Sequence, residues 1–227
     1  MLQLNQLRVG YNGRPVTSPI NGVFAPFTMT SITGVNGAGK SALLKTLAGL
    51  QPLIDGEIVH PWPASKIAWL PQYAEIDSQI PLSVFDMVAT GCWPECGWFR
   101  GINRSMKQRI HSALESVGMA EAAELLPGSL SGGQLQRVLF ARMLVQQADL
   151  LLLDEPFSAV DRQTTQKLIM LLKQLQLTGK TVLVVLHDHA LIEDHFQQIL
   201  SLDSCSEDLA ESRTAYIVPA SLTEEDA

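Results

Sequence analysis

Short apolar runs alternate along the chain with segments in which apolar residues recur at helical spacing. Residues 150–153 and 181–186 are apolar almost without a break, which is typical of strands buried on both faces of a parallel sheet. Residues 29–33 and 67–70 are further strand candidates. Strands that alternate with helices in this way predict an α/β fold built on a parallel sheet.

Four segments show the spacing of an amphipathic helix, with apolar residues three and four positions apart. A glycine follows three of them within two residues, which is typical of a helix end. Between residues 73 and 148 only helices and loops are expected, so this block is predicted to be a mostly helical insertion into the core. The four predicted helices are 41–48, 106–117, 135–147 and 164–177.

The charge of the chain is concentrated at one end. The 227 residues carry a formal net charge of −7, and seven acids with one base among residues 203–227 account for −6 of it. The remainder is close to neutral and lacks the basic field with which proteins grip nucleic acid, so no nucleic-acid partner is predicted. With 46% hydrophobic and 17% charged residues, the chain has the composition of a globular protein with a sizeable core.

Targeting and cysteine signals are weak. No stretch reaches the roughly 20 apolar residues needed to cross a bilayer, and residues 1–11 lack the layout of a signal peptide. The three cysteines, Cys92, Cys96 and Cys205, are too few for a disulfide framework. We therefore expect a reducing, cytosolic environment.

Residues 34–41, Gly-Val-Asn-Gly-Ala-Gly-Lys-Ser, match the pattern G-x-x-x-x-G-K-[ST]. They follow a strand candidate and open a helix candidate, which is the context that this motif requires. Glycines let successive N–H groups turn inward, and the helix N-terminus adds partial positive charge, so the loop is predicted to hold the β- and γ-phosphates. Lys40 supplies a mobile cation, and the Ser41 hydroxyl is suited to Mg²⁺.

Two carboxylates, Asp154 and Glu155, end the apolar run 150–153, and Pro156 follows them. Catalytic groups gather at the carboxyl edge of parallel sheets. Next to a phosphate loop, Asp154 is predicted to hold Mg²⁺. Glu155, which strand alternation would point the other way, is predicted to accept a proton from the attacking water. A solvated acidic turn is the alternative.

The string Leu130-Ser131-Gly132-Gly133-Gln134 precedes the predicted helix 135–147. Ser131 is suited to cap that helix, and the glycines let backbone N–H groups face an anion. An ordinary capped helix is the alternative. In order and spacing, the three motifs resemble those of the nucleotide-binding subunits of ABC transporters, and the resemblance extends over residues 1–202.

That resemblance implies a fold and a division of the chain. The fold is a P-loop NTPase (RecA-like) core with a parallel sheet, an antiparallel β lead-in and a mostly helical inserted subdomain. One domain would span residues 1–227. It would consist of a core (1–72 and 149–203), a helical subdomain (73–148) and an acidic tail (204–227).

The resemblance also implies roles for individual residues, with ATP as substrate and Mg²⁺ as cofactor. Gln72 and His187 join Glu155 as catalytic residues; the alternatives are a polar strand end and a core histidine. Tyr11 is expected to stack on adenine, although aromatic residues at strand ends often only pack. The ATP-binding residues are Tyr11, Gly34, Val35, Asn36, Gly37, Ala38, Gly39, Lys40, Ser41 and Ala42. The Mg²⁺ ligands are Ser41, Gln72 and Asp154. The signature residues, which would contact the ATP bound by a second chain, are Leu130, Ser131, Gly132, Gly133 and Gln134. The D-loop residue is Asp161.

Two positions depart from the family pattern. Ala42 stands where a hydroxyl residue often follows the phosphate loop, so weaker binding of the α-phosphate is expected. Residues 18–29 lack the usual Gly-Glu turn, so this lead-in loop is expected to be remodelled.

Partners follow from the same resemblance. Two chains would pair head to tail at the cytoplasmic face of the inner or plasma membrane, with a separate integral membrane permease and a solute-binding protein. Residues 81–91 and the string Gly97-Trp98-Phe99-Arg100 resemble zinc and manganese importer ATPases. Ser83 is suited to cap a short helix whose apolar face, Val84, Phe85 and Val88, packs inward. The Trp-rich loop 92–99 is a candidate permease surface or a satellite hydrophobic cluster.

Other functions stay open at this point. The same ATPase could instead drive the import of iron–siderophore, haem or cobalamin. The chain could also be a soluble ABC protein of DNA repair or translation. A metal site at Cys92 and Cys96 is a weak alternative, because a second pair is missing and free cysteines are more often buried filler. A zinc cluster of His187, Asp188, His189 and His195 is weaker still.

Overall fold

The computed structural model describes residues 1–72, 81–96, 101–202 and the backbone of 217–219. Apart from the backbone of 217–219, the acidic tail lies outside the described residues, as do Cys205 and the end of the Trp-rich loop (97–99). The chain forms two compact units. The core unit comprises Met1–Trp69, Asp149–Asp154 and Leu172–Ala227, and the helical unit comprises Leu70–Ala148 and Glu155–Leu171. The predicted division places residues 155–171 in the core instead.

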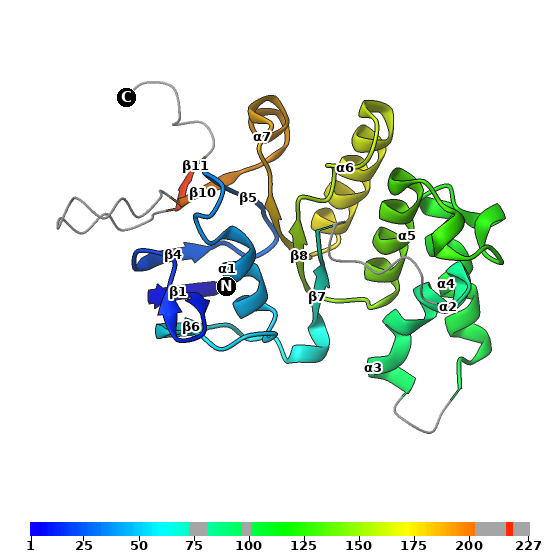
Figure 1. Cartoon of the computed structure of the whole chain (residues 1–227), viewed down its shortest axis with the longest axis horizontal. Coiled ribbons are helices and arrows are strands. Elements are labelled where there is room, and N and C mark those ends of the chain that lie inside the picture. Colours follow the sequence, from blue (N-terminus) through cyan, green and yellow to red (C-terminus); the bar gives the residue numbers. More distant parts are fainter. Residues whose placement is uncertain (73–80, 97–100, 203–216, 220–227) are drawn as a thin grey trace. The chain divides into compact units, whose positions relative to one another are not determined.

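A six-stranded sheet has the order β11-β10-β5-β9-β8-β7 (Figure 1). Neighbours in the run β10, β5, β9 and β8 are parallel, and β11 pairs with β10 in the antiparallel sense. All five residues of β8 and of β9 are buried, as their unbroken apolar runs predict. The four predicted strands are confirmed, and β10 and β11 complete the sheet. Their bounds are β5 Met29–Gly34, β7 Ile67–Leu70, β8 Leu150–Asp154, β9 Thr181–Val185, β10 Gln198–Leu202 and β11 Ile217–Pro219.

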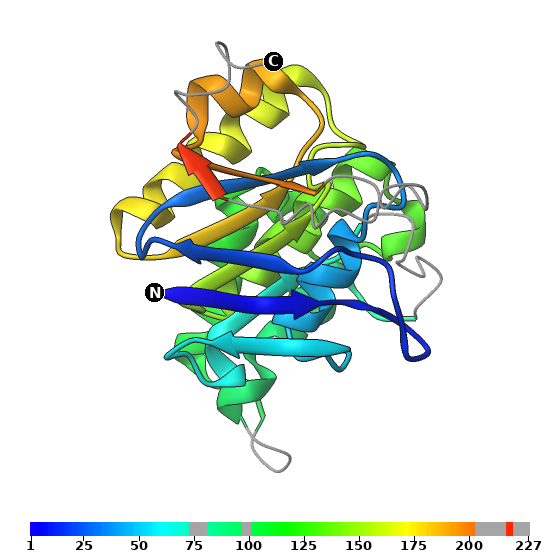
Figure 2. The ribbon, with the colours of Figure 1, turned by 90° about the vertical axis from the view of Figure 1, so that its left-hand side faces the viewer.

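The antiparallel lead-in is confirmed as a three-stranded sheet in which β1 (Leu2–Arg8) lies between β4 (Ile20–Phe24) and β6 (Asp55–Val59) (Figure 2). The register of β1 shifts against both neighbours around Gln6, whose φ is +49°. This bulge breaks the alternation of buried and exposed side chains, so Leu2, Leu4 and Leu7 are all fully buried.

Helix α1 (Lys40–Leu47) contributes to the same hydrophobic core as the two sheets. Leu43 and Leu44 of the helix are fully buried with Phe24 of β4 and Ile32 of β5. Gly49, with φ +72°, follows the helix. Because β5 and α1 are both anchored in one core, the loop between them has fixed ends.

A small hairpin of β2 (Gly10–Tyr11) and β3 (Arg14–Pro15) follows β1. Asn12 and Gly13 form its two-residue turn, with φ of +52° and +76°. Positive φ at both central residues is the geometry of a type I′ turn, which Asn-Gly favours and which matches the twist of antiparallel strands.

In the helical unit, α2 (Val84–Ala89), α4 (Arg104–Ser116) and α5 (Gly132–Val145) pack against one another. No strand lies within its described residues between 73 and 148, as predicted. The Ser83 hydroxyl caps α2 by accepting from Asp86 N at 3.1 Å, which confirms the predicted cap. The other described helices of the chain, from either unit, are α3 Trp93–Cys96, α6 Arg162–Leu177, α7 His189–His195 and the 3₁₀ turns Ala64–Lys66, Thr90–Cys92, Ala120–Ala122 and Pro127–Ser129.

The apolar face of α2 differs in one detail from the prediction. Val84 and Val88 are fully buried, whereas Phe85 is only half-buried, with its ring centroid 5.3 Å from that of His111. Among the helices of the described residues, none is both long and apolar enough to span a bilayer.

Candidate functional site

The loop 34–39 joins β5 to α1 in the core unit. Gly39 is the N-cap of α1 with φ +92°, so the helix begins at Lys40, one residue before the predicted start. The Lys40 side chain turns back over the loop, and its Nζ donates to the carbonyl oxygens of Gly34 (2.8 Å) and Val35 (3.0 Å). Lys40 is buried, so its ammonium lies inside the loop. A buried cation within a ring of backbone groups is suited to a polyanion.

The sheet order brings three predicted site elements to one edge. Strands β5, β9 and β8 are neighbours and parallel, so their carboxyl ends meet at the same side. β5 runs into Gly34, β8 ends at Asp154, and His187 lies two residues beyond the end of β9. Asp154 is 1% exposed, whereas His187 is exposed, so the alternative of a buried core histidine does not hold.

The donor set in the core unit fits a magnesium ion. Ser41 lies in the first turn of α1 and offers a hydroxyl oxygen, and Asp154 offers carboxylate oxygens at the end of β8. Hard oxygen ligands are those that Mg²⁺ prefers. Gln72, the third predicted ligand, lies in the helical unit.

Gln72 and Glu155 meet within the helical unit, where Gln72 Nε2 donates to Glu155 Oε2 at 2.9 Å. Glu155 has a left-handed backbone with φ +46° and lies outside β8, so the prediction that strand alternation sets its direction is wrong. Its carbonyl accepts from the N–H (3.3 Å) and hydroxyl (3.1 Å) of Ser158, which hold this turn. Left-handed backbone at a residue other than glycine costs about 1–3 kcal/mol and is concentrated at functional sites.

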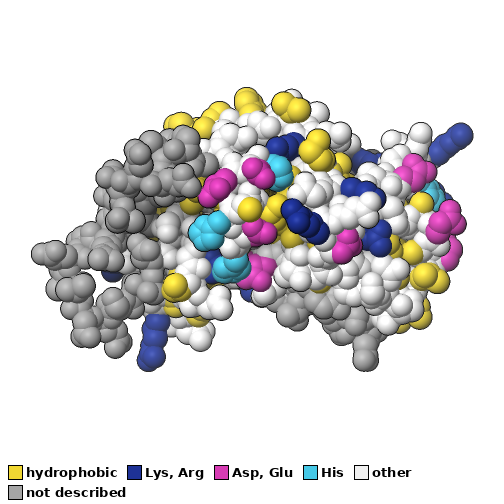
Figure 3. Space-filling view, turned by 90° about the horizontal axis from the view of Figure 1, so that it is seen from above, with side chains coloured by type: hydrophobic (Ala, Val, Ile, Leu, Met, Phe, Trp, Pro, Cys, Tyr) yellow, Lys and Arg dark blue, Asp and Glu magenta, His cyan; other side chains and the backbone are white. Residues whose placement is uncertain are grey.

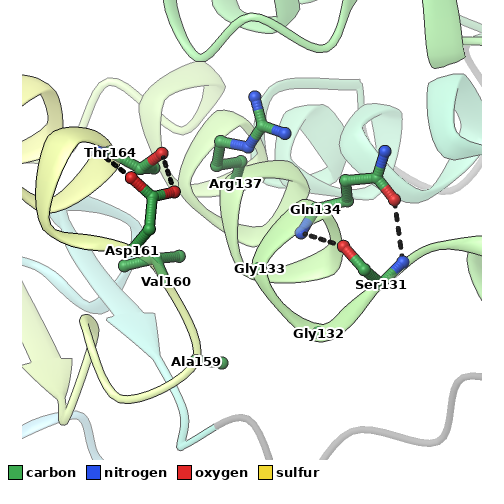
Figure 4. A pocket seen from close by; sticks show the side chains of 9 residues that line it. All are labelled: Ser131, Gly132, Gly133, Gln134, Arg137, Ala159, Val160, Asp161 and Thr164. Atoms are coloured by element: carbon green, nitrogen blue, oxygen red, sulfur yellow. Dashed lines mark hydrogen bonds between the residues drawn. The ribbon is translucent and has the colours of Figure 1, made fainter.

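The string 130–134 opens α5 with a capping box, shown in Figure 4. Gln134 N donates to Ser131 Oγ (3.3 Å), and Ser131 N donates to Gln134 Oε1 (2.8 Å), so the predicted cap is confirmed. A Cβ on Gly133 would lie 2.9 Å from Ala159 O, so a side chain there would push the two segments apart.

A pocket of about 340 Å³ lies between the start of α5 and the start of α6, all within the helical unit. Asp161 lines it and accepts from Thr164 N (3.0 Å) and Thr164 Oγ1. These two hydrogen bonds lower the pKa of Asp161, so the carboxylate keeps its charge. The lining residues are Ser131, Gly132, Gly133, Gln134, Arg137, Ala159, Val160, Asp161 and Thr164 (Figure 4).

Two predicted ATP-binding residues of the core unit differ sharply in exposure. Tyr11 is 48% exposed on the hairpin, so the alternative of a packed ring does not hold. Ala42 is fully buried in the hydrophobic core, which leaves only its backbone for contact with a phosphate.

The alternative metal readings find no support in the structure. Cys92 and Cys96 are buried, one against Arg109 Nη2 (3.5 Å) and the other against Met106 Sδ (3.4 Å). Histidines lie beside acidic side chains on the face in Figure 3. In the part of the chain that the structure describes, however, no three His, Cys, Asp or Glu side chains form a group that could hold a metal ion.

Sequence reasoning missed two side chains near these elements. Arg137 lines the pocket and donates to the carbonyls of Val117 (3.3 Å) and Gly118 (3.2 Å). Gln51 connects α1 to the hairpin through hydrogen bonds described below. Neither lies in a motif, and only tertiary contacts reveal them.

Removing the Ser131 hydroxyl tests the capping box. Ser131→Ala is expected to lower the free energy of unfolding by about 1 kcal/mol, because the N–H of Gln134 loses its acceptor. Ser129→Ala is the matched control, since the exposed Ser129 hydroxyl donates to Leu126 O without capping a helix. Urea unfolding of both variants measures the difference, and equal losses would contradict the role of the cap.

Comparisons with known proteins agree over most of the chain. The family model described as ABC transporter matches residues 17–158. The zinc transport system ATP-binding protein TroB of Treponema pallidum is 41% identical over 207 residues, covering 89% of this chain and 78% of that protein. The manganese transport system ATP-binding protein MntB of Listeria innocua is 38% identical over 208 residues, covering 89% and 86%.

The fold agrees with a solved structure as well. An ATP-binding cassette solved as a dimer in a post-hydrolysis state with ADP and phosphate superposes with a TM-score of 0.79. It is 23% identical, and the match covers 97% of this chain and 99% of that one.

Proposed function

This chain belongs to the ABC transporter family and is an ATP-hydrolysing transporter subunit, and we propose that its transporter imports zinc or manganese through a separate permease. The observation that carries the proposal is the match to zinc and manganese transport proteins along 89% of the chain, helical unit included. The similarity to these proteins extends beyond the nucleotide-binding motifs. It therefore supports a similar permease partner as well as a similar ATPase activity.

In the proposed mechanism, the core unit holds the triphosphate. Phosphoryl transfer depends mainly on positioning and on stabilisation of charge. The backbone of residues 34–39 surrounds the phosphates, and Lys40 exchanges its two carbonyl partners for phosphate oxygens. Ser41 and Asp154 would hold Mg²⁺, which neutralises charge on the β- and γ-phosphates when bound. His187, at the same edge of the sheet, donates to the γ-phosphate.

Glu155 acts as the general base in this mechanism. Its carboxylate takes a proton from the attacking water, which is the role of an acidic side chain next to a phosphate site. The hydrogen bond from Gln72 fixes the direction of this carboxylate. Gln72 would also be a ligand of Mg²⁺, and through it the presence of bound nucleotide would be communicated to the membrane partner.

We propose that the functional form is a head-to-tail homodimer. The signature residues Leu130–Gln134 then meet the γ-phosphate bound by the other copy. The capping box supports this role because it orients the Ser131 hydroxyl and leaves the start of α5 as a terminus with partial positive charge. Asp161, whose carboxylate stays charged, lines the same pocket and lies at the proposed dimer interface.

The permease is proposed to dock on the helical unit near α3, at the cytoplasmic face of the membrane. Trp93 is 66% exposed there, which is unusual for so large an apolar side chain. Cys92 and Cys96 on either side of it are buried and anchor the short helix. A solute-binding protein would deliver the metal to the permease from the far side.

Transport in reconstituted vesicles tests the cargo. We expect ATP-dependent uptake of zinc or manganese when the chain is combined with its permease and binding protein. The matched control is the same assembly with Glu155→Gln, which keeps the subunits together but stops turnover. Uptake of iron–siderophore, haem or cobalamin in place of these metals would contradict the proposed cargo. Failure to co-purify with any integral membrane protein would favour a soluble ABC protein.

A further inference from the structure

The hairpin that carries Tyr11 is a rigid unit. Its turn, Asn12-Gly13, has only two residues, and Val16 N donates to Val9 O (2.9 Å) at its base. Tyr11 pairs with Arg14 across the two strands. Because such a hairpin has little internal freedom, the position of the Tyr11 ring depends on how the base of the hairpin is fastened.

The first link between the hairpin and the rest of the core unit is a direct contact with the phosphate loop. A Cβ on Gly39 would lie 2.5 Å from Thr17 Cγ2 and 3.1 Å from Val16 Cγ2. The Thr17 hydroxyl in turn accepts from Val9 N at 3.1 Å, below the hairpin. The last glycine of the loop and the base of the hairpin are therefore in van der Waals contact.

The second link, between the hairpin and helix α1, is the side-chain amide of Gln51. Its Nε2 lies 3.3 Å from Gly10 O, 3.2 Å from Ala42 O and 3.1 Å from Thr46 Oγ1, and its two N–H groups are shared among these three acceptors. Gly10 is the residue before Tyr11, and Ala42 is the residue after Ser41. One amide group thus joins the strand of Tyr11 to the first turns of α1.

We infer that Gln51 is a positioning residue for the adenine of ATP, because it sets the span between the Tyr11 ring and the phosphate loop. A nucleotide held at both ends requires this span to match the distance from base to phosphates. Gln51 acts through Gly10 and does not itself touch the nucleotide. The inference rests on the proposed function and on the predicted role of Tyr11 as the residue that stacks on adenine.

The test compares ATP with inorganic tripolyphosphate, which has phosphates but no base. Gln51→Ala is expected to raise the Kd for ATP about two- to ten-fold and to leave the Kd for tripolyphosphate unchanged. KM for ATP should rise with little change in kcat, since the chemistry of the γ-phosphate is untouched. Gln51→Glu is the matched variant. It has nearly the same shape, but its carboxylate cannot donate to Gly10 O, so it should bind ATP no better than Gln51→Ala.

A double-mutant cycle separates positioning from general stability. In the Tyr11→Ala background, Gln51→Ala should produce no further loss of ATP affinity, because both changes remove the same contact. Unchanged binding of tripolyphosphate shows that the phosphate loop of each variant is folded.

Three results would overturn the inference. These are an equal loss of tripolyphosphate affinity, wild-type binding by Gln51→Glu, and additive losses in the cycle. If Tyr11→Ala weakens ATP binding while Gln51→Ala does not, only the inference fails. If Tyr11→Ala binds ATP like the wild type, the proposed role of Tyr11 fails and the inference with it.

Discussion

Replacing Glu155 by glutamine is expected to lower ATP turnover by about 10²–10⁴-fold, the usual contribution of a general base. Glutamine keeps the size of the side chain and can still accept the hydrogen bond from Gln72 Nε2. It cannot take the proton of the attacking water. Nucleotide binding should be retained, because the phosphate loop and Lys40 are unchanged.

This variant should also accumulate as an ATP-bound dimer, since in the proposed dimer ATP would bridge the two copies until it is hydrolysed. ATPase assays measure the first effect, and light scattering with and without ATP measures the second. Glu124→Gln is the matched control, because it removes the same charge from an exposed position of the helical unit. Near-normal turnover by Glu155→Gln would refute its role as the base.

Replacing Lys40 by alanine is expected to weaken ATP binding by about 10- to 100-fold. The ammonium is buried inside the loop, and hydrogen bonds from a charged donor contribute about 1.5–3 kcal/mol each. The loop should keep its shape, because the backbone bonds Ala38 N to Val35 O and Leu43 N to Gly39 O do not involve the side chain.

Equilibrium binding of ATP to Lys40→Ala and to Lys107→Ala measures this loss. Lys107 is exposed on α4, so its removal changes the net charge equally and should leave ATP affinity intact. Equal affinities in the two variants would contradict the phosphate-binding role of Lys40. Denaturant unfolding of both checks that the loss is one of binding.

Patterns that depend on local spacing could be predicted from the sequence. The strands β8 and β9 are unbroken apolar runs, and their burial on both faces requires that composition. The caps at Ser83 and Ser131 follow from side-chain chemistry within four residues. The phosphate loop was found for the same reason, since its glycines, lysine and serine are contiguous.

Features set by tertiary contacts could not be predicted in this way. The bulge at Gln6 changes which side chains of β1 face the core, so the strand lacks a regular alternation. The left-handed backbone of Glu155 overrides the strand period that the sequence suggests. The role inferred for Gln51 depends on hydrogen bonds to carbonyls that are 9 and 41 residues away, which no local pattern indicates.

β5 lies inside the six-stranded sheet, and this position is expected to make the start of the phosphate loop less mobile than the hairpin that carries Tyr11. β5 is bonded on both sides, to β10 and β9, and its first four residues are buried. Its amide hydrogens therefore exchange with solvent only when the whole sheet opens. Among the described residues the hairpin β2–β3 pairs with no third strand, so it is held to the core at its base and can move as one unit. In the proposed site, the triphosphate would therefore bind at a part of the chain that rarely opens, whereas the adenine would bind to a hairpin that can shift as one unit.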